Sequence, residues 1–82
     1  MIVAYIAHPY GGNPANLLRA RRWLRWIRRE HPNVSPIAQW VIECWLVPET
    51  PDSRPLGLAR ACALVARCDE LWLVGGQLSG GM

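Results

Sequence analysis

The segment Ile2–Asn13, IVAYIAHPYGGN, determines how the rest of the chain is organised. Its first six residues are apolar and rich in β-branched side chains, which is typical of a strand buried on both faces. The apolar run stops at His8-Pro9, and Gly11 and Gly12 then allow the backbone to turn tightly. We therefore expect a central strand whose carboxyl end opens into a loop.

A basic helix is predicted directly after this loop. Asn13 suits the N-cap and Pro14 the first helical position, because proline lacks an amide that would otherwise be unpaired there. Apolar residues recur at intervals of three and four as far as about His31. The face that we expect to meet the sheet carries Leu17, Ala20, Leu24 and Ile27, with Trp23 beside them.

The other side of this helix combines arginines with a large aromatic residue, and two interpretations of it stay open. The ring of Trp26 either covers arginine stems on a solvated surface or belongs to an oligomer interface, where Trp and Arg are both enriched. Five Trp in 82 residues favour the interface and a homo-oligomer. The predicted interface residues are Arg19, Arg22, Trp26 and Arg29.

The middle of the chain predicts one short strand and one ambiguous segment. Residues 34–38 are broken by Pro36, so they suit only a brief or edge strand. Residues 39–47 fit a helical turn or two or an extended piece, and we favour the helix. Residues 48–55 are a loop by composition.

A second long helix and a third strand complete the pattern. Asp52 or Ser53 can cap the helix, which we expect to run to Cys68. Its predicted buried side carries Leu58, Ala61, Cys62, Val65 and Cys68, and the acids at 69–70 mark its exit. Residues 71–74 then form an apolar strand that leads into the glycine-rich stretch 75–82.

The order strand, helix, short strand, helix, strand predicts one α/β domain over residues 1–82. We expect a flavodoxin- or Rossmann-like three-layer fold with a short parallel sheet in the order 2-1-3. The first and third strands are then neighbours, so loops 8–12 and 75–82 meet over one crevice. That crevice is the first place to look for a ligand.

Composition narrows the classes of function. The net charge of +3 is modest and no known nucleic-acid motif is present, so nucleic-acid binding by the basic helix is kept only as a third, weaker alternative. No apolar run reaches the roughly 20 residues that span a bilayer, and we expect a soluble, cytoplasmic protein. Three cysteines without CxxC spacing favour reduced, mostly buried thiols over a metal site. Neither a metal nor a cofactor is expected, and a P-loop sequence is absent.

Three residues of the first strand and its loop can be assigned either to ligand binding or to a structural role. His8 either contacts a ligand or packs in the turn and hydrogen-bonds the backbone. Tyr10, in the loop, can stack on a base. Tyr5, in the middle of the strand, is expected in the core.

Three motifs together carry a family resemblance: YIAHPYGG followed by Asn16 and a basic helix, CDELWLVGG, and LSGGM. In order and spacing the chain resembles the nucleoside 2-deoxyribosyltransferase-like proteins. The resemblance implies a flavodoxin-like domain that cleaves or exchanges the N-glycosidic bond of 2-deoxynucleosides or their monophosphates. A nucleoside or nucleotide is accordingly the expected small-molecule partner.

The resemblance also implies which residues bind. His8, Pro9, Tyr10 and Gly11 would line the base and sugar pocket, and the turn at 79–82 would hold the sugar or phosphate. The full set of expected ligand-binding residues is His8, Pro9, Tyr10, Gly11, Gly12, Gly75, Gly76, Ser79, Gly80, Gly81 and Met82.

No catalytic residue is assigned by the resemblance. The nucleophilic Glu of the family would follow Met82, and the second helix reads Arg60-Ala61-Cys62 where family enzymes tend to have an Asp. Two explanations stay open: the sequence is a piece of a longer protein, or the chain is a short relative without the chemistry. A non-catalytic oligomeric interaction protein that uses the Trp26 face is the alternative function.

Overall fold

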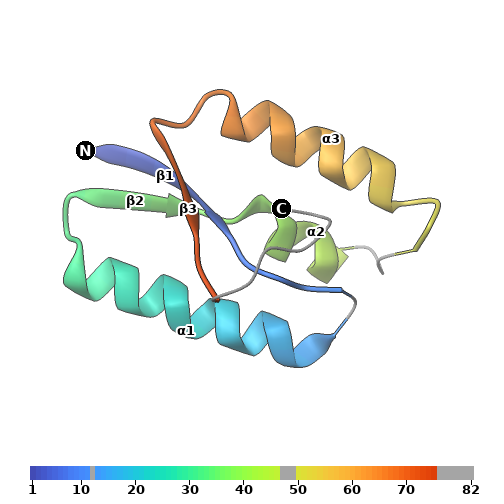
Figure 1. Cartoon of the computed structure of the whole chain (residues 1–82), viewed down its shortest axis with the longest axis horizontal. Coiled ribbons are helices and arrows are strands. Elements are labelled where there is room, and N and C mark those ends of the chain that lie inside the picture. The colour runs from blue at the N-terminus through green and yellow to red at the C-terminus, as the bar shows by residue number, and fades with distance from the viewer. Residues whose placement is uncertain (12, 47–49, 76–82) are drawn as a thin grey trace.

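The computed structural model describes residues 1–11, 13–46 and 50–75 of the chain. Its elements, in chain order, are β1 (Ile2–Ala7), α1 (Pro14–Glu30), β2 (Val34–Ile37), α2 (Gln39–Leu46), α3 (Arg54–Val65) and β3 (Glu70–Leu73) (Figure 1). The strands and helices predicted from the sequence are therefore confirmed, including the helix favoured for residues 39–47.

The three strands form one parallel sheet in the order β2-β1-β3, which confirms the predicted α/β fold. In the register, Tyr5 of β1 lies between Ile37 of β2 and Leu71 of β3. The connection from β1 to β2 and the one from β2 to β3 run in opposite directions, so right-handed crossovers place their helices on opposite faces. Figure 1 shows α1 on one side of the strands and α3 on the other.

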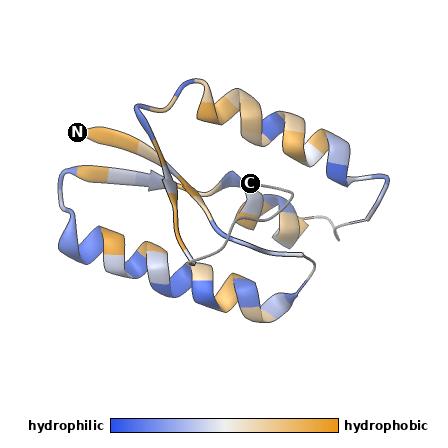
Figure 2. Cartoon of the chain, viewed as in Figure 1, coloured by the Kyte–Doolittle hydropathy of each residue, from blue (hydrophilic) through white to orange (hydrophobic). Residues whose placement is uncertain are grey.

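The best-buried contact joins β1 to α1. Ala4 and Ile6 of β1 pack against Ile27 of α1, and all three are at most 1% exposed. Half-buried apolar residues surround this cluster: Leu24, Val34, Ala38, Trp72 and Val74. The face of α1 predicted to meet the sheet does so, while the rest of the helix is mainly hydrophilic (Figure 2).

The other face of β1 carries Tyr5, which is buried as predicted. Burial raises the pKa of the Tyr5 hydroxyl, and a hydrogen bond with the backbone of Trp40 in α2 opposes part of that rise. Cys62 and Cys68 lie near enough to raise the pKa further. Tyr5 therefore faces the α2 and α3 layer.

The predicted burial of α3 is only partly right. Leu58, Ala61, Val65 and Cys68 are half-buried, but Cys62 is exposed, and no residue of α3 is fully buried. Three strands about 4.8 Å apart give a narrow sheet, and two helices about 10 Å across share this face. The sheet is too narrow to cover α3, so the prediction of mostly buried thiols is wrong for Cys62.

The ends of α3 also differ from the prediction. The helix ends at Val65 rather than Cys68, and Ser53 occupies the N-cap without a side-chain capping bond. Ser53 has helical φ and ψ angles of −85° and −26°. Its hydroxyl oxygen instead accepts hydrogen bonds from the backbone N–H and the hydroxyl of Thr50, at 2.9 and 3.1 Å.

The third strand is less buried than its apolar sequence suggests. As the edge of the sheet, β3 leaves Leu71 and Leu73 about half exposed, while Trp72 faces the α1 side. Across residues 1–11, 13–46 and 50–75, no helix combines the length and the apolar character needed to cross a bilayer.

Candidate functional site

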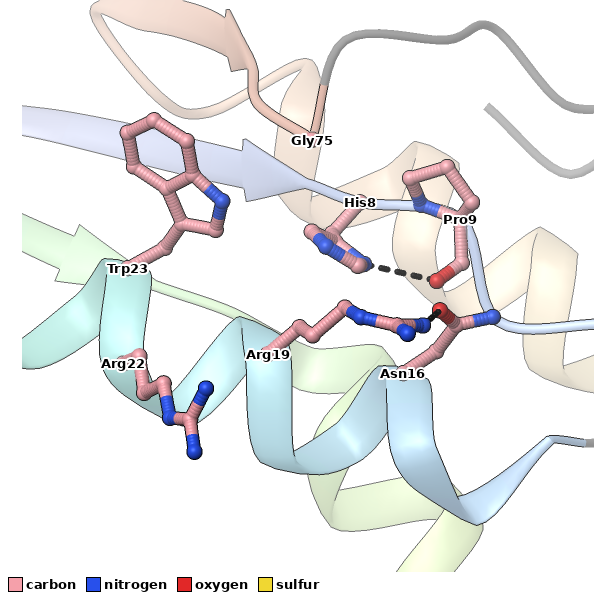
Figure 3. Close-up of a pocket in the computed structure, with 7 residues that line it drawn as sticks. All are labelled: His8, Pro9, Asn16, Arg19, Arg22, Trp23 and Gly75. Atoms are coloured by element: carbon pink, nitrogen blue, oxygen red, sulfur yellow. Dashed lines mark hydrogen bonds between the residues drawn. The ribbon is translucent and has the colours of Figure 1, made fainter.

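A pocket of about 710 Å³ lies where β1 ends and α1 begins (Figure 3). Its walls are formed by the turn after β1, by one flank of α1 and by Gly75, which follows β3. The described residues that line it are His8, Pro9, Asn16, Arg19, Arg22, Trp23 and Gly75. Its volume falls within the range of about 300–1,000 Å³ that is common for small-molecule sites.

The turn after β1 is fixed to the start of α1. The side-chain oxygen of Asn13 accepts a hydrogen bond from the backbone N–H of Ala15 at 3.0 Å, which confirms the predicted cap. The carbonyl of Tyr10 accepts from the backbone N–H of Asn13 and from the side-chain amide of Asn16. Gly11 has a φ of +58°, which a residue with a side chain rarely adopts.

Asn16 links this turn to a cation. Its amide nitrogen donates to the carbonyl of Tyr10 at 2.8 Å, and its side-chain oxygen accepts from Nη1 of Arg19 at 2.9 Å. Figure 3 shows the Arg19 side chain extending along the pocket toward Asn16. A guanidinium held in this way keeps further N–H donors for a ligand.

The imidazole of His8 is positioned by neighbours on several sides. It is 6% exposed, and its ring stacks on that of Trp40 with 6.2 Å between centroids and 11° between planes. Its Nδ1 lies 2.7 Å from the carbonyl oxygen of Pro9, which can only accept, so Nδ1 is the donor. In the neutral ring Nε2 is then an acceptor.

Gly75 closes the third side of the pocket. Its φ is +91°, and a Cβ atom there would lie 2.7 Å from Cδ2 of His8 and 3.1 Å from Cδ of Pro9. Real Cβ atoms essentially never show contacts below 3.0 Å. The backbone at the end of β3 therefore approaches His8 as closely as only glycine allows.

The structure brings the first and last predicted loops together as far as they are described. His8, Pro9 and Gly75 line one pocket, as predicted. Gly11 forms the adjoining turn, and the ring of Tyr10 packs against Trp40 at 5.9 Å instead of lining the pocket. The other predicted residues lie outside the described part of the chain: Gly12, Gly76, Ser79, Gly80, Gly81 and Met82.

Four pocket residues were not assigned to the crevice from the sequence: Asn16, Arg19, Arg22 and Trp23. The sequence predicts Arg19 and Arg22 at an oligomer interface and Trp23 beside the buried face of the helix. The sequence does contain a pattern that could have located these residues: positions 16, 19 and 23 follow helical spacing and therefore lie on one stripe of α1. The first of these positions lies one turn into the helix, beside the loop.

Trp26 is 40% exposed and lies in a row of aromatic rings along α1. Its ring makes edge contacts with Trp23 at 5.8 Å and with His31 at 5.4 Å, and His31 in turn contacts Trp72 at 5.2 Å. These contacts fix the orientation of the indole while leaving much of its surface accessible.

Carboxylates lie elsewhere in the described structure. None of the described residues that line the pocket is Asp or Glu. Asp69 lies at the amino end of β3, where Oδ2 accepts a hydrogen bond from the N–H of Val3 at 2.8 Å and its own N–H donates to the carbonyl of Val3. Glu43 pairs with Arg60 at 3.3 Å. Within the described residues, no cluster of His, Cys, Asp and Glu could hold a metal ion.

These features define a small α/β domain with a basic pocket at the carboxyl ends of its parallel strands. The family model for a domain of unknown function, DUF7768, matches residues 2–82, so the chain belongs to that family. Neither the comparison with curated proteins nor that with solved structures gives a match.

Proposed function

We propose that this domain binds a nucleoside or nucleotide in the pocket formed by the turn after β1, Gly75 and α1. The observation that carries the proposal is the placement of a guanidinium and an aromatic ring in one hollow, with Arg19 and Trp23 both lining it. An aromatic face suits a base, and a guanidinium suits a phosphate.

The position of the pocket in the fold supports the same conclusion. Ligands of open α/β sheets bind outside the carboxyl ends of the strands, where neighbouring connections leave in opposite directions. Here the connection that leaves β1 leads through α1 to β2 on one side of β1, and β3 lies on the other side of β1. The resemblance to nucleoside 2-deoxyribosyltransferase-like proteins adds independent support for a nucleoside.

The buried imidazole of His8 gives the pocket a hydrogen-bonding group in a fixed orientation. Because Nδ1 of His8 donates to the carbonyl of Pro9, neutral His8 offers Nε2 as an acceptor. A sugar hydroxyl or a base amino group is a suitable donor for that nitrogen.

The activity proposed for the described residues is binding. The resemblance implies N-deoxyribosyl transfer or hydrolysis, and that chemistry needs a carboxylate at the anomeric carbon. The described pocket residues supply no carboxylate, so we assign them no step of it. We also propose a cytoplasmic location, where Cys44, Cys62 and Cys68 would remain reduced.

Calorimetric titration with 2-deoxynucleosides and their 5′-monophosphates tests this proposal. We expect the monophosphate to bind about 10- to 100-fold more tightly than the nucleoside, because a charge-assisted hydrogen bond with Arg19 contributes roughly 1.5–3 kcal/mol. Arg19→Gln should remove most of that difference.

The matched control is Arg67→Gln, which changes an exposed arginine just after α3 that hydrogen-bonds the carbonyl of Ala63. It lowers the net charge equally and should leave binding unchanged. Absence of heat with nucleosides and monophosphates of every common base would contradict the proposal.

A further inference from the structure

A second feature of α1 lies next to the pocket on the outward side of the helix. Arg22, Arg25 and Arg29 recur at intervals of three and four, so they share one stripe, and Trp26 lies between them. We call these four residues the arginine face. All four are exposed, and at a rise of 1.5 Å per residue they extend over about 10 Å of the helix.

The charge of this face is almost uncompensated. Glu30 is the only acid of α1, and its Oε1 pairs with Nε of Arg29 at 3.0 Å. Arg22 and Arg25 make no ion pair with any residue in the described part of the chain. The surface therefore presents fixed positive charge around a half-exposed indole.

From this combination we propose that the arginine face binds single-stranded nucleic acid. Phosphate groups complement Arg22 and Arg25, and an unpaired base can stack on the accessible surface of Trp26. The edge contacts of Trp26 with Trp23 and His31 hold the indole in place, so little of its freedom remains to be lost on binding.

The same charges disfavour other occupants of this face. A second copy docked on this face by two-fold symmetry would bring arginines of both chains close together, and Glu30, the one acid of α1, is already paired with Arg29. A duplex keeps its bases stacked and would use the arginines but not the indole. The modest net charge of the chain and the lack of a known binding motif weigh against nucleic acid, but on this face of α1 exposed arginines lie beside an accessible indole ring.

Fluorescence anisotropy of a labelled oligodeoxythymidylate, titrated with the whole protein at several salt concentrations, tests this inference. We expect the affinity to fall as salt rises. Arg25→Gln should weaken binding severalfold and make the slope of log K against log salt shallower by about 0.7. Trp26→Leu should also weaken binding but leave the salt slope unchanged, because stacking releases no counterions.

Arg25 is not among the described residues that line the pocket, so mononucleotide binding should persist in Arg25→Gln, and failure of one proposal is separable from failure of the other. Arg67→Gln is again the charge-matched control. Circular dichroism checks that Trp26→Leu folds. If this variant does not fold, the effect of Arg25→Gln on affinity and on the salt slope still tests the proposal.

Several results would overturn the inference. They are no anisotropy change at low salt, equal weakening by Arg67→Gln, and equal affinity for duplex of the same length with no effect of Trp26→Leu. Binding to phosphatidylserine vesicles but not to the oligonucleotide would also overturn it. So would a dimer that Trp26→Leu dissociates in the absence of oligonucleotide binding.

Discussion

Gly75 lies so close to His8 that a Cβ atom on Gly75 would approach Cδ2 of the imidazole to 2.7 Å and Nε2 to 2.8 Å. This approach joins the end of β3 to the turn after β1. Because the ring of His8 is also stacked on Trp40 and its Nδ1 donates to Pro9, it cannot move aside without losing those contacts. The shape of the pocket therefore depends on the absence of a side chain at position 75.

Gly75→Ala should destabilise the protein by about 1–3 kcal/mol, since alanine is strained at φ +91° and its methyl group meets His8. The free energy of unfolding in urea measures this effect. The matched control is Gly57→Ala in α3, where a Cβ atom would meet nothing within 4 Å. It should stabilise the protein by roughly 0.5–1 kcal/mol, because alanine favours a helix. Equal effects of the two substitutions would contradict the described contact.

The fold was largely predictable because its main elements have regular apolar patterns. The continuous run in β1 and the helical spacing of Ala20, Leu24 and Ile27 indicate a buried strand covered by a helix. The alternation of strands and helices then restricts the strand order. Local residue types also marked the cap at Asn13 and the glycine turn.

Other features depend on the width of the sheet and on the direction in which each flank of a helix faces, and the sequence pattern contains neither. Cys62 is exposed because the sheet is too narrow to cover two helices, although its spacing matches that of half-buried neighbours. Arg19 lines the pocket because its flank of α1 faces the turn and Gly75. A helical pattern separates buried from exposed residues but does not say which exposed flank borders a cavity.

Asp69→Ala should lower the free energy of unfolding by about 1 kcal/mol. Asp69 accepts a hydrogen bond from the N–H of Val3 and thereby ties the amino end of β3 to β1. Asp69→Asn should cost less, because an amide oxygen can still accept that bond. Urea denaturation gives both values, with Asp52→Ala in the exposed loop before α3 as the control. A loss with Asp52→Ala as large as that with Asp69→Ala would argue against the assigned role.

Stability should fall at alkaline pH because of Tyr5. Burial raises the pKa of its hydroxyl above the ordinary value of 10.0. Above pH 10 the unfolded chain therefore loses this proton first, and folding becomes less favourable as pH rises toward the folded pKa. Below pH 10 both states keep the proton, and the contribution is fully present.

The free energy of unfolding, measured between pH 9 and about pH 11.5, tests this linkage. Tyr5→Phe should flatten the dependence on pH in this interval, because it removes the buried hydroxyl whose pKa is raised. A steep loss of stability that persists in Tyr5→Phe would assign the alkaline transition to other groups.

The central claim, that the pocket beside α1 binds a nucleotide, is tested most directly by ¹⁵N–¹H spectra recorded during titration with a deoxynucleoside monophosphate. We expect saturable shifts at the amides of Asn16 and Gly75 and at the indole N–H of Trp23, which all border the pocket. The indole N–H of Trp45, on a side chain 85% exposed in α2, should stay unchanged. Shifts confined to Trp45 and its neighbours, or no shifts for any base, would contradict the account.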